Sequence, residues 1–426
     1  MTLFLGIDIG TSGCRACVID ANARIRAEST HPLPAPVREG ARIEQDPECW
    51  WEALTATLDE LAITLSMDAI AAIAIDGTSA TLLLCTANGE PLTPALMYND
   101  ARAGQQAQRI ERIASADCAA HGASSSLAKL LYLQATPAAQ HARFALHQAD
   151  WLLGRLAGRY GQTDENNALK LGYDPVNRSW PDWLDSLGVA RSLLPQVLPP
   201  GQSIGRIAAV AARRWGLAEN TRIVSGTTDS TAGFIATGAG RGEAVTSLGS
   251  TLVLKVCSDR PVFVPEYGVY SHRLGDDWLV GGASNTGGAV LRRCFSPREI
   301  DRLSAAVRPD QPTGLDYYPL PAAGERFPEN NPGRQPCLEP RPDDDRIFFQ
   351  AILEGIAAIE QRGYRLLEGL GAPYPRRVHT VGGGAANVAW RRIRQDRLRV
   401  PVIAALHQEA AYGAALLARQ GASCEL

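Results

Sequence analysis

The amino-acid sequence predicts an α/β protein of two domains. Its 426 residues exceed the size that one hydrophobic core usually serves, so two domains are the default expectation. An apolar strand, a turn of glycine and hydroxyl residues and a second strand follow one another over residues 3–20, and a similar pattern recurs over residues 244–256. Strand-like and helical segments alternate through the rest of the chain. We place the boundary near residue 240, which gives domains of residues 1–240 and 241–426.

The composition favours a small-molecule partner. The chain carries 42 Lys and Arg residues against 45 Asp and Glu, a formal net charge of -3, so neither nucleic acid nor a membrane surface is indicated as a partner. No signal-type start and no apolar stretch of membrane-spanning length is found, which favours the cytoplasm. The nine cysteines are scattered, as is typical of reduced thiols. A monomer and a homodimer are equally open.

The first domain begins with strands and then a helix. Strands are expected at 3–9, 14–20 and 22–30. A helix follows in PECWWEALTATLDELAITL, where Pro47 suits a first helical turn. The next apolar strand, AIAAIAIDGTS, ends in Asp76 as the first ends in Asp8, so we expect both acids to face one site. Asn88-Gly89 predicts a hairpin, and helices are expected near 100–114, 126–135 and 146–158.

The region around the boundary repeats the opening pattern. A strand that starts at residue 221 reaches Gly226-Thr227-Thr228-Asp229, and a helix is expected from Ser230. Strand, turn and strand then come again, with the turn at Gly249-Ser250-Thr251. Further strands are expected at 268–274 and 278–285, a proline-rich loop at 317–342, a helix at 343–370, a strand–glycine turn–helix–strand unit at 376–405, and a closing helix at 409–420 packed through its small residues.

Metal and redox motifs are weak in this sequence. Cys14 and Cys17 spell C-x-x-C, but they lie in an expected strand, where positions three apart face opposite sides. We therefore interpret them as strand packing rather than as a redox pair or half of a zinc site. The histidines show no H-E-x-x-H or similar close spacing, so a dedicated protein-ligated metal site is not expected.

Two glycine turns could bind phosphate. Backbone N–H groups and hydroxyls converge in such turns, and the pair Gly10–Gly13 and Gly249–Thr251, one per domain, could hold a polyphosphate. No P-loop occurs, because the chain has no Gly-Lys pair, and no G-x-G-x-x-G opens the first helix. VGGGAAN, at 381–387, would by itself be a packing turn, but beside these turns it suits a flat ligand.

Two aspartates are candidates for chemistry. Asp229 stands between a strand and a helix, where an N-cap and a general base for a sugar hydroxyl are about equally expected. Asp8 is either satisfied by neighbouring backbone N–H groups or helps to bind Mg²⁺ through water, because that ion keeps much of its hydration.

These segments, in this order, resemble the FGGY carbohydrate kinases, a branch of the actin, Hsp70 and hexokinase superfamily. GIDIGTSGCRACVID looks like the family's first phosphate motif, SLGSTLVL like its second, and GTTDSTAGFIATGA like the segment with its catalytic aspartate. VGGGAANVAWRRIRQDRLRVPV looks like the adenosine motif and QAILEGIAAIEQRGYRLLEGLG like the second signature helix. SSSLAKLLYLQ departs from the first signature, because Tyr132 stands where tryptophan is usual. The likeness covers essentially the whole chain.

The resemblance implies two actin-like (ribonuclease H-like) domains that close on a cleft, with the sugar and the catalytic base in residues 1–240 and ATP in residues 241–426. Asp229 would be the general base and Asp8 a ligand of the Mg²⁺ environment, with Asp229 also near the ion. The implied sugar contacts are Asp8, Asp76, Ser79 and Asp229. The residues implied to face ATP are Gly10, Thr11, Ser12 and Arg15 at the transferring phosphate, Gly249, Ser250 and Thr251 at the other phosphates, and Gly383, Gly384, Asn387 and Trp390 at the adenine.

The resemblance implies an ATP-dependent sugar kinase. Xylulokinases of this family usually have glutamine, methionine and histidine where this chain has Asp76-Gly77-Thr78-Ser79, a version that looks like compact kinases of D-ribulose. We therefore expect D-ribulose as substrate, with D-xylulose or another ketose or polyol as the alternative. Asn99, Asp100 and Arg102 either contact the sugar or, as we favour, brace its loop. Two other classes stay open: an actin- or Hsp70-like nucleotide switch, and a catalytically silent sugar-binding regulator.

Overall fold

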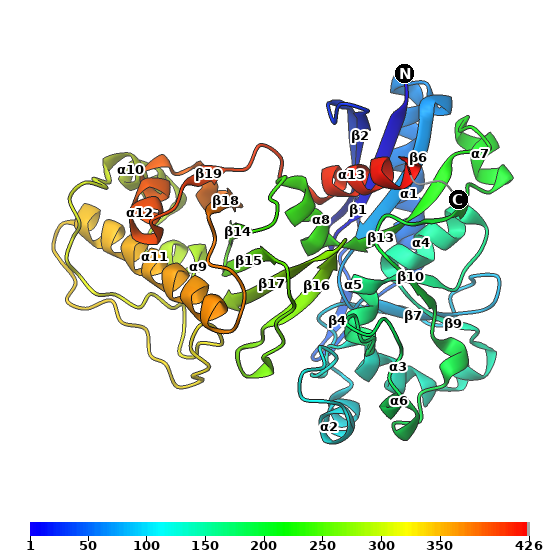
Figure 1. Ribbon diagram of the computed structural model, residues 1–426, viewed down its shortest axis with the longest axis horizontal. Coiled ribbons are helices and arrows are strands. Elements are labelled where there is room, and N and C mark those ends of the chain that lie inside the picture. The colour runs from blue at the N-terminus through cyan, green and yellow to red at the C-terminus, as the bar shows by residue number, and fades with distance from the viewer. Residues whose placement is uncertain (424–426) are drawn as a thin grey trace. The chain divides into compact units, whose positions relative to one another are not determined.

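The computed structural model describes residues 1–423, and these form two compact units. Unit 1 consists of Met1–Ala236 together with the segment that begins at Glu409, and unit 2 consists of Thr237–Gln408. Figure 1 shows the elements of both units along the chain. Each unit has its own hydrophobic core, as expected for independent domains.

Unit 1 is built on a six-stranded sheet in the order β12-β13-β6-β1-β2-β3. The strands are β1 (Leu3–Ile9), β2 (Gly13–Asp20), β3 (Ile25–Pro32), β6 (Ile70–Gly77), β12 (Ser203–Arg206) and β13 (Arg222–Thr228). The three strands β1, β6 and β13 run parallel, and the others are antiparallel to their neighbours. The carboxyl ends of the three parallel strands therefore meet at one edge.

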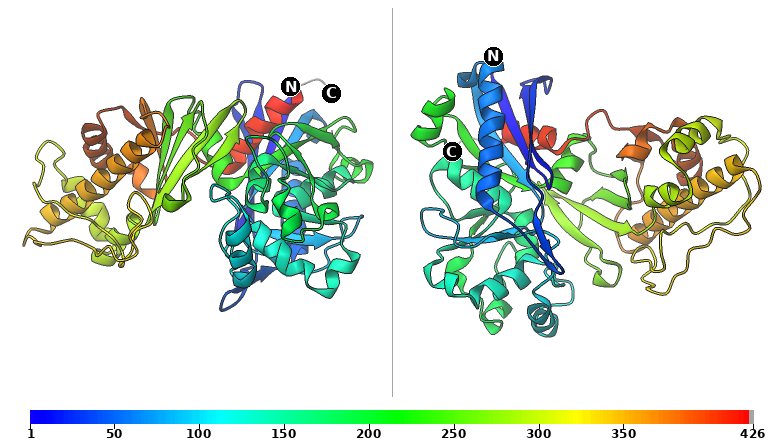
Figure 2. Two further views of the ribbon diagram at one scale, coloured as in Figure 1. Left: turned by 60° about the horizontal axis from the view of Figure 1, so that its bottom comes forward. Right: turned by 180° about the vertical axis from the view of Figure 1, so that it is seen from behind.

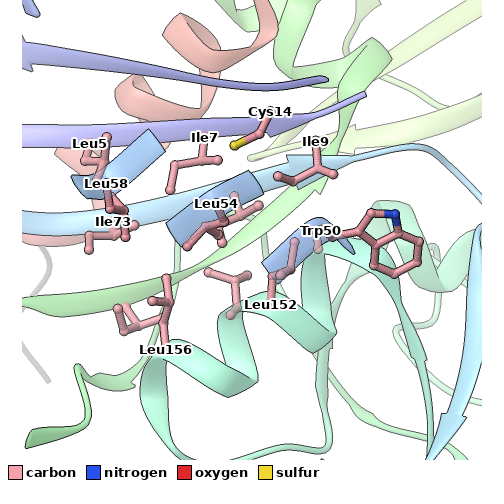
Figure 3. Packing of buried hydrophobic residues seen from close by; sticks show 14 of the residues in the cluster. Leu5, Ile7, Ile9, Cys14, Trp50, Leu54, Leu58, Ile73, Leu152 and Leu156 are labelled. Atoms are coloured by element: carbon pink, nitrogen blue, oxygen red, sulfur yellow. The ribbon is translucent and has the colours of Figure 1, made fainter. Parts of the chain in front are cut away.

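The two faces of this sheet are covered by different helices. Figure 3 shows Leu5, Ile7 and Ile9 of β1 packed with residues of α1 (Pro47–Thr64) and α4 (Gln148–Ala157). Successive side chains of a strand point to opposite faces. The even-numbered positions of β1 therefore face α8 (Asp229–Ala236) and α13 (Ala410–Ser423), as the cluster of Phe4 with residues of α13 shows.

A smaller part of unit 1 surrounds a five-stranded sheet in the order β4-β5-β8-β7-β9. The helices around it are among the cyan and green ribbons of Figure 2. Its strands are β4 (Val37–Glu39), β5 (Arg42–Gln45), β7 (Leu82–Cys85), β8 (Ala95–Leu96) and β9 (Phe144–His147). Helices α2 (Gly104–Ile113), α3 (Ser126–Gln134) and α6 (Trp183–Ser186) contribute to its own apolar cluster. Unit 1 also contains the pair β10 (Gln162–Asp164) and β11 (Gln196–Leu198), and helices α5 (Glu165–Ala168) and α7 (Ala209–Trp215).

Unit 2 repeats the arrangement of the main sheet of unit 1. Its order is β16-β17-β15-β14-β18-β19, with antiparallel strands on one side of β14 and parallel strands on the other, as around β1. The strands are β14 (Glu243–Leu248), β15 (Leu252–Ser258), β16 (Tyr270–Leu274), β17 (Asp277–Ser284), β18 (Arg377–Val381) and β19 (Val402–Ala404). The helices are α9 (Gly288–Cys294), α10 (Pro297–Ala306), α11 (Asp345–Gly369) and α12 (Val388–Leu398). The predicted α/β class and the repeat are thus confirmed.

The core of unit 2 contains a fully buried ion pair. Arg394 of α12 donates to both carboxylate oxygens of Glu360 of α11, at 2.6 and 2.7 Å, and both side chains are inaccessible to solvent. Thr246 of β14 donates to the same carboxylate at 2.6 Å, and Arg394 also donates to Thr380 of β18 at 2.7 Å. The pair therefore fixes both helices against the sheet.

The last helix differs from the expected division of the chain. A helix was predicted over residues 409–420, and the structure has it at Ala410–Ser423, packed through small residues. However, α13 belongs to unit 1 rather than to the domain of residues 241–426 (Figure 1). A Cβ atom on Gly413 would lie 1.9 Å from the carbonyl oxygen of Ala232, and one on Gly6 would lie 2.1 Å from that of Ala411. Such close backbone contact between distant segments leaves no pattern in the local sequence.

Other expectations about single segments can be compared directly. Cys14 and Cys17 are free thiols that belong to the clusters on opposite faces of the sheet, as the strand assignment predicted. Burial raises the pKa of each thiol to about 12, so both are poor nucleophiles. Among residues 1–423, no helix is both long and apolar enough to span a membrane.

Candidate functional site

Three aspartates of unit 1 lie where three parallel strands end. Asp8 of β1 is paired in register with Asp76 of β6, and Thr227 of β13 is paired with Asp76 on the other side. Asp229 follows two residues later, as the first residue of α8. The carboxyl ends of such strands are where open α/β sheets bind ligands. The expected meeting of Asp8 and Asp76 is therefore present in the sheet register.

A bulge in β13 brings Asp229 to this edge. The pairing of β13 with β6 shifts between Val224 and Thr227. Gly226 lies within the shift, where a Cβ atom would stand 1.8 Å from the carbonyl oxygen of Ile75, so only glycine fits. The Asp229 carboxylate accepts a hydrogen bond from the Ser230 N–H at 2.5 Å, and its charge helps to raise the pKa of Asp76.

The turn after β1 presents exposed hydroxyls next to Asp8. The N–H of Gly10 donates to the Gly13 carbonyl at 3.0 Å, which leaves Thr11 and Ser12 exposed at its tip. Arg15 stands opposite Asp8 in the β1–β2 register, and its guanidinium donates to the Asp8 carboxylate at 3.1 Å. The turn therefore combines hydroxyl groups with a cation, and both can donate hydrogen bonds to an anion.

Asp8 and Asp76 behave as a pair that shares a proton. Among residues 1–423, no amide, hydroxyl or guanidinium group donates to either oxygen of Asp76, and the side chain is fully buried. Burial, followed by the charge of Asp8, raises the pKa of Asp76 well above its usual range. Burial also raises the pKa of Asp8, but a hydrogen bond from Asp76 and the charge of Arg15 oppose that rise. A proton on Asp76 supplies the donor for that bond, so the directions of the two pKa shifts favour Asp76 over Asp8 as the site of that proton.

The segment after Asp76 forms a tight turn that carries Ser79. The N–H of Thr81 donates to the Thr78 carbonyl at 3.4 Å, and Ala80 has φ of +69°, a conformation that non-glycine residues rarely adopt. Gln148 of α4 accepts from the Thr78 N–H at 3.1 Å and so fixes the start of the turn. Ser79 is partly exposed at its tip, while Asp76 is buried against Asp8.

Two residues of the MYNDAR segment, Asp100 and Arg102, make contacts that hold the segment in place. Asp100 is fully buried and accepts the N–H of Ile43 at 2.6 Å. Arg102 donates to Asp100 at 2.7 Å and to Glu44 at 2.7 Å, which ties the segment to β5. Asn99 is different, because its buried side-chain oxygen has no hydrogen-bond partner among residues 1–423.

In unit 2, the corresponding turn follows β14. Gly249, Ser250 and Thr251 join β14 to β15, and the start of α9 docks on them, since the N–H of Gly288 donates to the Gly249 carbonyl at 2.9 Å. Arg292 of α9 donates to the Ser250 hydroxyl at 2.7 Å. The predicted turn thus has a guanidinium beside it that the sequence did not single out.

A cavity of about 670 Å³ opens beside this turn, wholly within unit 2. Its size falls in the range of ordinary small-molecule sites. Most of the predicted residues line it: Gly249, Ser250, Gly383, Gly384, Asn387 and Trp390. Thr251 does not. Apolar side chains from other elements complete the wall: Leu248, Leu291, Ile300 and Phe349.

The glycine segment after β18 forms the floor of this cavity. Gly382 has φ of +82°, and a Cβ atom on Gly384 would stand 2.7 Å from the Trp390 ring and 2.8 Å from the Leu248 Cβ atom. Asn387 caps α12 by accepting the Trp390 N–H at 2.9 Å and donates to Ser304 at 3.0 Å. Trp390 is only 2% exposed and its indole donates to the Leu353 carbonyl, so it supports the wall more than it faces a ligand.

Several residues of these sites were not predicted. Arg292 and Ser304 lie on helices without motifs, and Gln148 and Lys129 reach the Ser79 turn from α4 and α3. Glu409 precedes α13 and raises the pKa of Asp8 by its charge. Sequence proximity could not reveal these, since each comes from a distant segment. Among residues 1–423, no group of three His, Cys, Asp or Glu side chains is arranged to hold a metal ion.

Known sequences match both units of this chain. Residues 3–236 match the N-terminal domain, and residues 244–421 the C-terminal domain, of the FGGY family of carbohydrate kinases. The xylulose kinase of Escherichia coli is 26% identical over 92% of this chain and 84% of its own length. The xylulose kinase of Streptomyces rubiginosus is 29% identical, and the match covers 95% of this chain and 85% of that protein.

Solved structures share the fold. A xyloylose kinase from Brucella ovis has a TM-score of 0.89 at 24% identity and covers 99% of this chain and 90% of that one. A Plasmodium falciparum glycerol kinase with ADP has a TM-score of 0.85 at 18% identity, and the match covers 98% of this chain and 89% of that one. The chain therefore belongs to the FGGY family of carbohydrate kinases, with that family's two-domain α/β fold, and is a phosphotransferase that acts on a carbohydrate.

Proposed function

We propose that this FGGY-family chain transfers the terminal phosphate of ATP to a hydroxyl group of a ketopentose. D-Xylulose is the first candidate, because the curated relatives from Escherichia coli, Bacillus subtilis and Streptomyces are xylulose kinases. None of these three relatives is named a kinase of D-ribulose, the substrate that the sequence led us to expect. The observation that carries the proposal is the set of Asp8, Asp76 and Asp229 at the ends of three adjacent parallel strands.

D-Ribulose stays as a second candidate because of one local feature. The turn after Asp76 presents Ser79, with Thr78 held by Gln148 at 2.9 Å through its hydroxyl, where glutamine, methionine and histidine are usual in xylulokinases. A short hydroxyl cannot make the contacts of a histidine ring. The hydroxyl pattern of the preferred sugar therefore depends on this turn.

Asp229 is the proposed general base. Its carboxylate takes the proton of the attacking sugar hydroxyl while that oxygen bonds to the γ-phosphorus and the bond from phosphorus to the leaving oxygen of ADP breaks. Its place at the start of α8, next to the strand ends that carry the other two acids, suits this role. Asp8 is proposed to orient the sugar and, with Asp229, water molecules of a Mg²⁺ ion.

We propose that three residues of unit 1 stabilise the negative charge of the transferred phosphate: Thr11, Ser12 and Arg15. Two exposed hydroxyls and the backbone of the Gly10 turn offer donors, and Arg15 adds a positive charge that is only partly used by Asp8. The ion supplied with ATP neutralises the phosphates when bound, and the described acids fit a water-mediated contact better than direct ligation.

The nucleotide is proposed to occupy the 670 Å³ cavity of unit 2. Gly249 and Ser250 would offer donors to its phosphates, while Gly383 and Gly384 allow a flat base to approach the backbone. Asn387 stands at the start of α12, where its own contacts hold it in place. Trp390 then acts as the support of this floor rather than as a stacking partner.

The test is ADP release with ATP and Mg²⁺ and a panel of D-xylulose, D-ribulose, other ketoses and polyols. We expect a ketopentose to give the highest kcat/KM. Asp229→Asn should lower kcat by about 10²–10⁴-fold, whereas Asp259→Asn, a change at an exposed carboxylate of unit 2, should leave it unchanged.

Three results would change the proposal in different ways. A preference for D-ribulose would select the second candidate. A preference for a hexose or a polyol would overturn the ketopentose class. ATP hydrolysis that ignores sugar and survives Asp229→Asn would instead indicate a nucleotide switch.

A further inference from the structure

Lys129 is a buried cation with no acidic partner. It lies on α3 with no solvent exposure, and among residues 1–423 no carboxylate forms an ion pair with it. Its ammonium donates instead to the carbonyl oxygens of Ala80 and Met97, both at 2.7 Å. A buried charge held only by carbonyls is costly, which suggests that its contacts have a purpose beyond packing.

The two carbonyls belong to two turns that are far apart in sequence. Ala80 is the left-handed residue of the Thr78–Thr81 turn, which carries Ser79 at its tip. The Met97 carbonyl also accepts the Asp100 N–H at 2.9 Å, so it opens a second turn, with Tyr98 and Asn99 at its tip. One ammonium group therefore joins both turns at their backbones.

The choice of residue type is specific to this position. The sequence holds 42 Lys and Arg residues, and only Lys129, Lys170 and Lys255 are lysines. A lysine presents three donors from one compact point, whereas the flat guanidinium of arginine is larger and directs its donors in a plane. Two carbonyls from separate turns, each 2.7 Å from one nitrogen, suit the lysine.

The surroundings of Lys129 lower the pKa of its amine. Burial lowers the pKa of Lys129 to about 7, the nearby Asp100 opposes that effect, and the positive charges of Lys170 and Arg102 add to it. Asp100 is already engaged by Arg102 and by the Ile43 N–H, so it does not neutralise the amine.

We propose that Lys129 is a positioning residue of the sugar site, which holds the Ser79 turn and the Asn99 turn at a fixed separation. This inference rests on the proposed function, since it takes Ser79 as a contact of the sugar. Lys129 itself does not touch the sugar, because it is fully buried behind the two turns. It acts through Ser79 and Asn99.

Steady-state kinetics with D-xylulose and D-ribulose form the first test. Lys129→Met keeps the length of the chain and removes all donors, so we expect KM for the better sugar to rise at least tenfold, with KM for ATP within twofold of the unsubstituted chain. Lys255→Met, in a strand of unit 2, serves as the control and should change neither value. Equal rises in both KM values would overturn the proposal.

A double-substitution cycle separates positioning from general weakening. If Lys129 acts through the Ser79 turn, Lys129→Met should raise KM for the sugar much less in a Ser79→Ala background than in the unsubstituted chain. Full additivity of the two effects would contradict action through Ser79.

Hydrogen exchange of the folded full-length chain tests the same contact without any substrate. In Lys129→Met, backbone exchange should accelerate in peptides that cover residues 78–81 and 97–100, with peptides of unit 2 unchanged. Unchanged exchange in both turns would overturn the inference even if the kinase activity is confirmed. Accelerated exchange in a chain without sugar kinase activity would keep the contact and reject the proposed function instead.

Unsubstituted protein provides a measurement that does not depend on the folding of a variant. With lysines labelled at the ε-carbon, three side-chain signals are expected, and Lys170→Arg and Lys255→Arg assign them. Saturating D-xylulose or D-ribulose, whichever is turned over, should shift the Lys129 signal and leave that of Lys255 in place. A Lys129 signal that does not respond at saturation would contradict the proposal.

Discussion

The two units share one sheet order but differ in how three of their fully buried charged groups are compensated. In unit 2 the fully buried Arg394 is matched by Glu360 through two hydrogen bonds. In unit 1 the fully buried Asp76 and Lys129 have no partner of opposite charge among residues 1–423. Paired buried charges fix a structure, whereas unpaired ones shift their pKa and change protonation. Asp76 and Lys129 of unit 1 are therefore expected to change protonation more readily than the Arg394–Glu360 pair of unit 2.

The largest expected effect comes from breaking the pair in unit 2. Arg394→Met leaves the Glu360 carboxylate buried without its cation, so we expect the free energy of unfolding to fall by about 3–5 kcal/mol. Arg365→Met is the matched control, because it breaks the exposed pair with Glu368 on the same helix and should cost about 0–1 kcal/mol. Urea denaturation of the full chain measures both.

A double substitution tests whether the orphaned charge causes this loss of stability. Replacing both members, Arg394→Met with Glu360→Leu, removes the orphaned charge and should recover much of the lost stability. Equal losses for Arg394→Met and Arg365→Met would show that unit 2 does not depend on this pair.

The second prediction concerns the unpaired cation of unit 1. The pKa of Lys129 falls from 10.5 to about 7 on folding. Between these values the unfolded chain binds a proton that the folded chain lacks, so this residue makes the folded state more stable as pH rises. The free energy of unfolding, relative to Lys129→Met, should increase by on the order of 3 kcal/mol from pH 7 to pH 10.

Urea midpoints of the two chains at pH 7, 8, 9 and 10 provide the measurement. The difference between the chains cancels the buried thiols, which act in the opposite direction because burial raises their pKa to about 12. Parallel pH profiles for the two chains would mean that Lys129 keeps its ordinary pKa in the folded state.

Local sequence was sufficient where the candidate site is built from short segments. The strand–turn–strand units around Gly10 and Gly249, the position of Asp229 and the glycine floor at 383–384 were all predicted, because tight turns and strand ends leave a residue pattern. The paired acids followed from two strands that both end in aspartate.

Tertiary contacts explain what local sequence could not predict. The sequence did not show that α13 packs in unit 1. Its place on β1 depends on Gly6 and Gly413, where the backbones of distant segments come into close contact. Trp390 resembles a ligand-stacking residue in sequence but is 2% exposed, because its indole reaches Leu353 on a neighbouring helix. The substrate contacts and roles of the acids remain predictions.

A third prediction addresses the nucleotide cavity and is smaller. In Gly384→Ala the new methyl group meets Trp390 and Leu248 below 3.0 Å, so the floor must shift, and overpacking of this kind costs about 1–3 kcal/mol. We expect KM for ATP to rise by roughly tenfold, with KM for the sugar unchanged. Gly369→Ala, where a Cβ atom meets nothing within 4 Å, is the control. A selective change in sugar KM would contradict the division of roles between the units.

The smallest expected effect concerns the cation beside the second turn. Arg292→Met removes the hydrogen bond to Ser250, so a rise in KM for ATP of several-fold, or about 1 kcal/mol, is expected. Arg293→Met changes the next arginine of α9, which is also exposed, and should have no effect. Isothermal titration with ADP measures both, and identical affinities of the two variants would remove Arg292 from the nucleotide site.

The position of α13 also has a consequence for protein synthesis. One face of the unit 1 sheet, with Phe4, Ala74 and Val224, is covered by a helix that begins only at Ala410. On the ribosome, all of residues 237–408 must be translated before that helix is available. Unit 2 is therefore free to fold first, although unit 1 is begun first, and during that interval the uncovered apolar face is a natural substrate for chaperones.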